Sequence, residues 1–357
     1  MSADAGMKTV LIVDDSPTAR MALRRAIEGA DSDLRVVGEA SDGLTALREA
    51  HRLRPDLITM DVHLGHDDGV NFTTTIMAVS PTRVVIVTGV DPKSPELTFR
   101  SLGAGALDVL AKLPGPATPT YERERARFVR TLRTLADVPV VRRRSGTIRP
   151  DLGHRPPSVH PAPGFHIERV LIGASTGGPP LLSDLLKGIP APLGAPLVIV
   201  QHISEGFGRG FASWLAESTG HPAIYCDGPE KLRPGTIYIA PDDRHLRLVR
   251  GDAIRPFDGP LRRFQRPSID ELFESAISIR PSGTLAILLT GMGSDGAQGL
   301  LGLREAGAHT IAQEPSSCVV DGMPRSAMDL GAALRVFEPE QISEALGNLP
   351  DLTELLG

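Results

Sequence analysis

The 357-residue sequence has only two cysteines, Cys226 and Cys318. That count excludes a disulfide framework and a zinc site built from cysteines. The sequence has no apolar run as long as a membrane span, and its net charge of −5 gives no electrostatic signature of nucleic-acid binding. Residues 1–8 lack the charged leader and apolar core of a signal peptide. We therefore expect a cytoplasmic protein with no membrane insertion and no nucleic-acid partner.

Two long stretches, residues 7–136 and 168–349, alternate short β-branched runs with helical patterns. Such alternation predicts βαβ units around a mostly parallel sheet. Residues 137–167 between them are rich in proline and arginine and have almost no apolar periodicity, which is typical of a solvated linker. Its arginines could instead contact a phosphate or an acidic surface. We predict two α/β domains joined by a linker at 137–167.

In the first domain, polar side chains follow four predicted strands. Asp14 and Asp15 follow one run of strand-forming residues, Asp61 follows another, Thr88 ends a third and Lys112 follows a fourth. Because the carboxyl ends of parallel strands meet at one edge of a sheet, these side chains should gather there. Clustered carboxylates need a cation, and Mg²⁺ takes oxygen ligands and keeps several waters, which suits a site that must also admit a phosphoryl group.

We therefore predict that Asp14, Asp15 and Asp61 hold Mg²⁺ and that Asp61 is the phosphorylated residue. Thr88 and Lys112 are then candidates for binding the remaining phosphoryl oxygens. The alternative is that the three acids only cap helices.

The second domain contains a candidate nucleophile in residues 173–177, which fit the pattern G-x-S-x-G. In that pattern a serine, here Ser175, lies on a tight turn between a strand and a helix, where helix N–H groups favour developing negative charge. The backbone N–H groups of Thr176, Gly177 and Met292 are candidate donors to an oxyanion. The glycines could instead serve a tight turn or bind a phosphate.

A nucleophilic serine needs a base, and the base needs an orienting acid. His202 follows the next predicted strand, and Asp295 lies in a glycine-rich turn after a later one, where it could instead cap the following helix. The order Ser, His, Asp differs from that of the α/β-hydrolases. His221 and His245 are rival bases. His221 lies after a helix, whereas His245 falls in 239–246, which we interpret as a hairpin turn that could line the pocket.

Over its whole length, the first domain resembles the response-regulator receiver family. The five residues named above match that family's acidic pair, phosphoacceptor, switch hydroxyl and lysine, and Asp68-Gly69 matches the turn after the phosphoacceptor. Leu64-Gly65 replaces the usual Met-Pro, Val109 replaces the usual aromatic switch residue, and Leu113 separates the lysine from proline. The resemblance implies a flavodoxin-like receiver fold; the differences concern dephosphorylation and the usual coupling between hydroxyl and aromatic switch.

From about residue 168 to 347, the chain resembles the catalytic domain of the CheB chemotaxis methylesterases. Six strings carry the resemblance in the family's order: GASTGGP, QHI, GTIYIAPDDRHL, RPSIDELFES, LLTGMGSDGA and AQEPSSCVVDGMPRSA. The resemblance implies a doubly wound α/β sheet and a catalytic triad of Ser175, His202 and Asp295. An upstream receiver is also that family's arrangement.

The same resemblance implies an esterase that is activated by phosphorylation and needs no cofactor of its own. It would remove methyl groups from glutamate γ-esters on methylated chemoreceptors, deamidate receptor glutamines, and receive phosphate from a histidine kinase of the chemotaxis type. Two other hypotheses remain open at this point: a non-enzymatic signalling module, and a hydrolase of another ester in a non-flagellar chemosensory pathway.

Overall fold

The computed structural model describes residues 7–29, 33–65, 67–89, 95–138 and 166–349. The chain divides into two compact units, one within Met1–Arg144 and the other within Ser145–Gly357. This division falls inside the predicted linker, of which only residues 137–138 and 166–167 are described. The rest of the linker prediction lies outside the described residues, and the two units are treated separately below.

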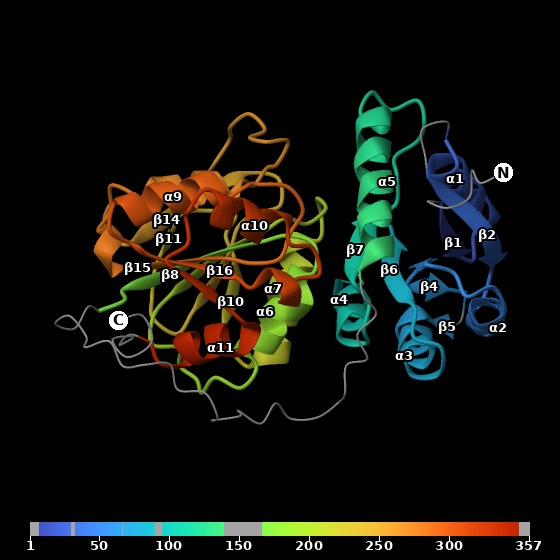
Figure 1. Ribbon diagram of the computed structural model, residues 1–357, viewed down its shortest axis with the longest axis horizontal. Coiled ribbons are helices and arrows are strands. Elements are labelled where there is room, and N and C mark those ends of the chain that lie inside the picture. Colours follow the sequence, from blue (N-terminus) through green and yellow to red (C-terminus); the bar gives the residue numbers. More distant parts are fainter. Residues whose placement is uncertain (1–6, 30–32, 66, 90–94, 139–165, 350–357) are drawn as a thin grey trace. The chain divides into compact units, whose positions relative to one another are not determined.

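The first unit is built around a five-stranded parallel sheet in the order β2-β1-β3-β6-β7, with a separate two-stranded hairpin, β4-β5 (Figure 1). Apart from the hairpin, this is the flavodoxin-like order, so the predicted receiver fold is confirmed. Its elements are β1 Lys8–Val13, α1 Pro17–Ile27, β2 Leu34–Ala40, α2 Gly43–Leu53, β3 Leu57–Met60, β4 His63–Leu64, β5 Asp67–Asp68, α3 Gly69–Val79, β6 Arg83–Thr88, α4 Pro95–Gly103, β7 Asp108–Ala111 and α5 Tyr121–Asp137.

Local sequence explains how the first strand of this unit, β1, leads into α1. Residues 10–13 of β1 are all buried, as expected for a strand that is covered on both faces. Ser16 then caps α1 by accepting a hydrogen bond from the Ala19 N–H, and Pro17 occupies the first helical position. The chain therefore turns from strand to helix immediately after Asp14 and Asp15.

The second unit contains a seven-stranded sheet in the order β10-β12-β9-β8-β15-β16-β17, and every neighbouring pair is parallel. Its elements are β8 Arg169–Ala174, α6 Gly178–Leu186, β9 Leu197–Gln201, α7 Gly208–Thr219, β10 Ala223–Tyr225, β11 Glu230–Lys231, β12 Ile237–Ile239, β13 His245–Val249, β14 Ala253–Phe257, α8 Ile269–Ala276, η1 Pro281–Gly283, β15 Thr284–Leu288, α9 Ala297–Glu305, β16 His309–Gln313, η2 Pro315–Ser317, α10 Gly322–Asp329, β17 Arg335–Phe337 and α11 Pro339–Gly347.

Helices cover both faces of this sheet: α9 and α10 lie on one face, and α6 and α11 lie on the other (Figure 1). Strand order runs outward in both directions from β8, which pairs with β9 on one side and with β15 on the other. The doubly wound prediction is therefore confirmed. Such sheets place ligands outside the carboxyl ends of the strands where the order reverses, which here is the edge next to β8.

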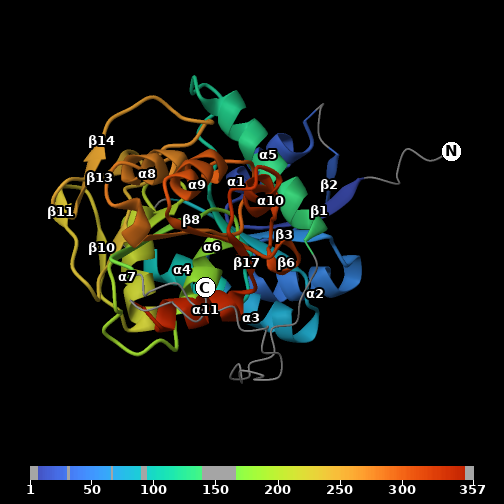
Figure 2. The same cartoon turned by 60° about the vertical axis from the view of Figure 1, so that its left-hand side comes forward.

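A second, three-stranded antiparallel sheet, β11-β14-β13, lies beside α8 (Figure 2). It corrects our interpretation of residues 239–246 as a hairpin turn, because β12 pairs with β9 whereas β13 pairs with β14. The segment instead carries the chain from one sheet to the other. Asp242 secures this crossing by accepting hydrogen bonds from the N–H groups of Gly206 (2.9 Å) and Gly208 (2.7 Å).

The chain's single tryptophan, Trp214, lies on α7 and is 6% exposed. Its fluorescence therefore reports on the second unit and not on the first. No helix in the described part of the chain combines the length and apolar composition that crossing a membrane requires.

Candidate active site and candidate metal-binding cluster

The three candidate metal ligands of the first unit meet at one edge of its sheet. Asp14 and Asp15 follow β1, Asp61 follows β3, and one carboxylate oxygen from each lies within 4.8 Å of the others. Asp14 and Asp61 are buried, whereas Asp15 is exposed. An acidic cluster with one open side is compatible with an oxygen-ligated metal ion.

Lys112 lies within the same cluster. Its Nζ is 2.6 Å from Asp14 Oδ2 and 2.7 Å from Asp61 Oδ2, and its backbone N–H donates to the carbonyl of buried Thr88. Burial alone would lower the pKa of Lys112, but its hydrogen bonds to the two aspartates raise it. Burial raises the pKa of Asp14, and the contact with Lys112 offsets only part of that effect. One lysine against three carboxylates leaves the cluster acidic, which suits a divalent cation.

The loop after Asp61 gives a physical meaning to the unusual Leu64-Gly65 pair. Gly65 adopts a positive φ of 65°, and its N–H donates to Asp15 Oδ2 at 3.1 Å. The proline that is usual in the family could not make this bond, because it has no N–H. The exposed member of the acidic pair is therefore held by the loop that follows the candidate phosphoacceptor. Val109 is buried in β7.

In the second unit, the three candidate catalytic residues follow neighbouring strands at the carboxyl edge. Ser175 follows β8, His202 follows β9, and Asp295 lies in the turn after β15. The strands are tied at this edge, because the Ser175 N–H donates to the Thr290 carbonyl at 3.0 Å and the His202 N–H donates to the carbonyl that precedes Ser175 at 2.9 Å. All three side chains are buried.

Asp295 accepts four hydrogen bonds. Its Oδ2 accepts from His202 Nε2 at 2.9 Å and from the Ile269 N–H at 2.8 Å, and its Oδ1 accepts from Ser268 Oγ at 2.8 Å and from the Asp270 N–H at 3.2 Å. Burial on its own would raise the pKa of Asp295, but the bond to His202 and the other donors lower it to about 2. The carboxylate is therefore ionised at neutral pH and lies at the positive N-terminus of α8.

This geometry settles which nitrogen of His202 is free. Because an ionised carboxylate can only accept, Nε2 carries the proton that Asp295 receives. His202 Nδ1 is the other ring nitrogen, and it is buried without a hydrogen-bond partner in the described part of the chain. No hydrogen bond joins His202 Nδ1 to Ser175 Oγ among the described residues. Catalytic hydrogen bonds are often long without substrate and shorten when it binds.

The turn after Ser175 leaves backbone donors free. Among the described residues, the N–H groups of Thr176, Gly177 and Met292 make no hydrogen bond, whereas the Gly178 N–H donates to the Ser175 carbonyl at 2.8 Å. Gly177 has a positive φ of 79° and directly precedes α6. The three candidate oxyanion donors therefore remain available for a ligand.

The two rival histidines occupy other environments. His245 Nε2 bonds to the Pro260 carbonyl at 2.9 Å, and its Nδ1 accepts the Ser268 N–H at 3.1 Å. Both ring nitrogens are thus engaged, which disfavours His245 as a base. His221 lies between the end of α7 and the start of β10, so it sits at the amino edge of the sheet, opposite the candidate site.

Sequence reasoning missed Ser268 and Asp270. Ser268 donates to Asp295, and Asp270, whose own pKa is raised by burial, accepts from the Gly299 N–H at 2.7 Å and so joins α8 to α9. Both residues belong to the string RPSIDELFES. That string was the available signal, but it carried no indication that its first polar residues would contact the acid of the site.

Family models match both units of the chain. A model of the response regulator receiver domain matches residues 10–118, and a model of the CheB methylesterase matches residues 170–346. A protein-glutamate methylesterase/protein-glutamine glutaminase of Anaeromyxobacter dehalogenans is 43% identical over 95% of this chain and 98% of its own. One from Hahella chejuensis is 41% identical over 96% and 98%. The CheB methylesterase catalytic domain of Thermotoga maritima, a crystal structure, is 35% identical over 51% of this chain and 97% of its own, with a TM-score of 0.48.

The two matches define a response regulator whose output domain is an enzyme. With about 40% identity over nearly its full length to these relatives, the chain belongs to the CheB methylesterase family.

Proposed function

We propose that this protein is a phosphorylation-activated serine esterase that converts glutamate γ-methyl esters on chemoreceptors to glutamate and methanol. The observation that carries the proposal is the buried His202–Asp295 pair at 2.9 Å, which lies next to Ser175 where the strand order reverses. The relatives named protein-glutamate methylesterase/protein-glutamine glutaminase support the substrate class.

In the proposed mechanism, Ser175 Oγ attacks the ester carbonyl while His202 Nδ1 accepts its proton. Asp295 fixes the tautomer of His202 and stabilises the imidazolium that forms. The N–H groups of Thr176, Gly177 and Met292 are proposed to bind the developing oxyanion, and one such donor typically contributes about 3 kcal/mol. His202 then gives this proton to the departing methoxide, so that methanol leaves and the acyl group remains on Ser175. Water attacks this acyl-enzyme while His202 takes its proton, and that proton returns to Ser175 Oγ as the glutamate carboxylate is released.

The same residues can act on an amide, because a glutamine side chain has the shape of the methyl ester. We therefore include receptor glutamines as substrates, as the names of the relatives suggest. A mere binding module would not need an ionised acid and a buried imidazole with one free nitrogen, so the non-enzymatic hypothesis is not favoured.

In the receiver, residues 7–136, we propose that Asp61 accepts a phosphoryl group from a histidine kinase of the chemotaxis type. Asp14, Asp15 and Asp61 would hold Mg²⁺, which when bound neutralises charge between the carboxylates and the phosphoryl oxygens. Thr88 and Lys112 would bind phosphoryl oxygens, and residues 137–167 would link the receiver to the esterase at 168–349.

Methanol release from membranes that carry a methylated chemoreceptor, with and without acetyl phosphate, tests this proposal. We expect acetyl phosphate to raise the wild-type rate in the presence of Mg²⁺ and to have no effect on Asp61→Ala. Ser175→Ala should release no methanol yet keep wild-type Trp214 fluorescence. Near-normal turnover by Ser175→Ala would exclude the serine mechanism, and phosphorylation of Asp61→Ala would move the phosphoacceptor elsewhere.

A further inference from the structure

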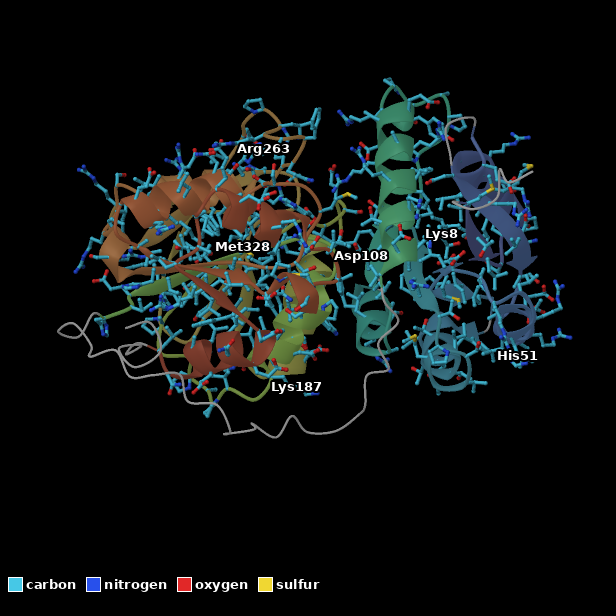
Figure 3. All side chains as sticks on the ribbon, in the orientation of Figure 1. Lys8, His51, Asp108, Lys187, Arg263 and Met328 are labelled. Atoms are coloured by element: carbon cyan, nitrogen blue, oxygen red, sulfur yellow. The ribbon has the colours of Figure 1, made fainter. Side chains whose placement is uncertain are left out.

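Residues 258–266, between β14 and α8, form a loop that projects from the second unit and is marked by Arg263 in Figure 3. We refer to it as the 258–266 hairpin. Backbone hydrogen bonds run in both directions between Arg262 and Gln265, at 3.0 and 2.8 Å, and close its turn. The two tip residues, Arg263 and Phe264, have positive φ angles of 48° and 65°. Non-glycine residues rarely adopt this region, so the turn needs support from elsewhere.

Two arginines supply that support. Arg262 donates to Glu274 Oε2 on α8 at 2.6 Å. Arg263 donates from Nε to the buried Asp270 at 3.1 Å and from Nη1 to Ser294 Oγ at 3.4 Å. The charges of both arginines are thus matched inside the unit, and the hairpin is braced against α8 and the turn that carries Asp295.

Of the other exposed side chains of the hairpin, two are large and apolar, and one is a cation without a carboxylate partner among the described residues. Phe264 is 84% exposed and is the one phenylalanine that is exposed in the described part of the chain. Leu261 beside it is 46% exposed. Arg266 is exposed, donates to the Gly259 carbonyl at 3.1 Å, and has no carboxylate partner among the described residues. An exposed aromatic side chain on the same short loop as a cation without a carboxylate partner is a candidate binding hot spot.

The tip and the end of the hairpin connect to residues around Asp295 of the candidate active site. Its Arg263 contacts Ser294, the residue before Asp295, and its last residue leads through Pro267 to Ser268, whose hydroxyl donates to Asp295. The hairpin is therefore tied to the acid side of the triad, through Ser294 and Ser268.

We propose that the 258–266 hairpin is a docking surface for the substrate protein, and this inference rests on the proposed function. Phe264 and Leu261 pack against an apolar part of the segment that flanks the glutamyl ester. Arg266 pairs with a carboxylate of that segment, the group that the proposed reaction itself produces. The hairpin thus recognises the protein around the ester and takes no part in the chemistry at Ser175.

Steady-state methanol release from a methylated chemoreceptor in membranes, measured with the phosphorylated full-length protein, tests this surface. Phe264→Ala should raise KM for the receptor about tenfold with little change in kcat. Hydrolysis of N-acetylglutamate γ-methyl ester, which has no flanking protein, should be unchanged. Arg266→Glu should also raise KM, and added salt should reduce the difference from wild type. The matched control is Leu334→Ala, an exposed leucine that precedes β17 at the opposite edge of the sheet.

The outcomes separate the inference from the proposed function. If the wild type releases no methanol from the receptor, the proposed function fails. If the wild type is active but Phe264→Ala has a normal KM for the receptor, the docking inference is wrong. A normal KM together with raised activity of the unphosphorylated protein would show that the hairpin binds the receiver instead. Equal losses on the receptor and on the small ester would show that Phe264 only supports the active site.

Discussion

Asp295 illustrates how one residue can link catalysis to folding. Its carboxylate holds His202, and the same carboxylate satisfies the N–H groups of Ile269 and Asp270 at the start of α8. The helix N-terminus in turn keeps Asp295 ionised. The orientation of the histidine therefore depends on where α8 begins.

Removing the hydroxyl that positions Asp295 should impair turnover without unfolding the protein. We expect Ser268→Ala to lower kcat by about tenfold, because the loss of one hydrogen bond to a charged group costs roughly 1.5–3 kcal/mol, of which only part reaches the transition state. The substitution should also raise the pKa of Asp295, because the Ser268 hydroxyl is one of the donors that lower it.

The control for this prediction is Ser275→Ala on the same helix. The Ser275 hydroxyl makes two hydrogen bonds, with the Leu248 N–H at 2.8 Å and the Leu272 carbonyl at 2.6 Å, and neither involves Asp295. Equal effects of the two substitutions on kcat would mean that Ser268 has only a structural role.

The low pKa of Asp295 predicts a pH-dependent contribution to stability. A carboxylate whose pKa falls from 3.8 to about 2 on folding stabilises the native state above pH 4. That contribution is lost as the pH falls from about 4 towards 2. Urea unfolding followed by Trp214 fluorescence measures the free energy of unfolding. The difference in this free energy between wild type and Asp295→Asn at pH 4.5 should therefore narrow at pH 2.5. The same difference in free energy at both pH values would contradict the low pKa of Asp295 in the folded protein.

At the scale of elements, the crossing from β15 to α9 is packed tightly against the strand that carries the candidate nucleophile. A Cβ added at Gly291 would lie 2.7 Å from the Ser175 Cβ and 2.3 Å from Met323 Sδ. These distances are too short for real atoms, so the serine or the methionine of α10 must move. Glycine at position 291 therefore lets the segment after β15, the turn that carries Ser175 and helix α10 pack closely together.

We therefore expect Gly291→Ala to reduce kcat by at least tenfold through displacement of Ser175, because small misplacements of reacting groups are costly. It should also lower the thermal stability of the second unit. Gly188→Ala is the matched control, since a Cβ there meets nothing within 4 Å. Normal turnover by Gly291→Ala would show that Ser175 tolerates movement.

The sequence predicted the parts of the site that depend on strand ends. Ser175 and His202 follow buried parallel strands, and the turn that carries Asp295 follows another, so their meeting at one edge needed only the strand pattern. The contact of Ser268 with Asp295 joins residues 27 positions apart and has no local pattern. Residues 239–246 misled us because a turn-like composition cannot tell whether the next strand pairs with the last one or enters another sheet.

For the whole molecule, we expect the unphosphorylated receiver to restrain the esterase. A linker such as the proline-rich segment 137–167 gives the two domains an effective concentration near the millimolar range for each other, so weak docking suffices. A change of about 1.4 kcal/mol in docking free energy shifts the ratio of open to closed forms tenfold. Deleting residues 1–140 should therefore raise basal methanol release and abolish the response to acetyl phosphate. If the isolated second unit is no faster than the unphosphorylated full-length protein, restraint by the receiver is excluded.

Because β8 pairs with β15, the sheet of the second unit cannot form until most of the chain has been synthesised. Arg169 of β8 donates a hydrogen bond to Thr284 of β15, which lies 115 residues further along the chain. All five strands of the receiver sheet precede β8. Because domains fold from the N-terminus during synthesis, the ribosome releases a complete receiver sheet before Ser175, His202 and Asp295 can meet. A nascent chain thus holds its regulatory unit before it holds a complete active site.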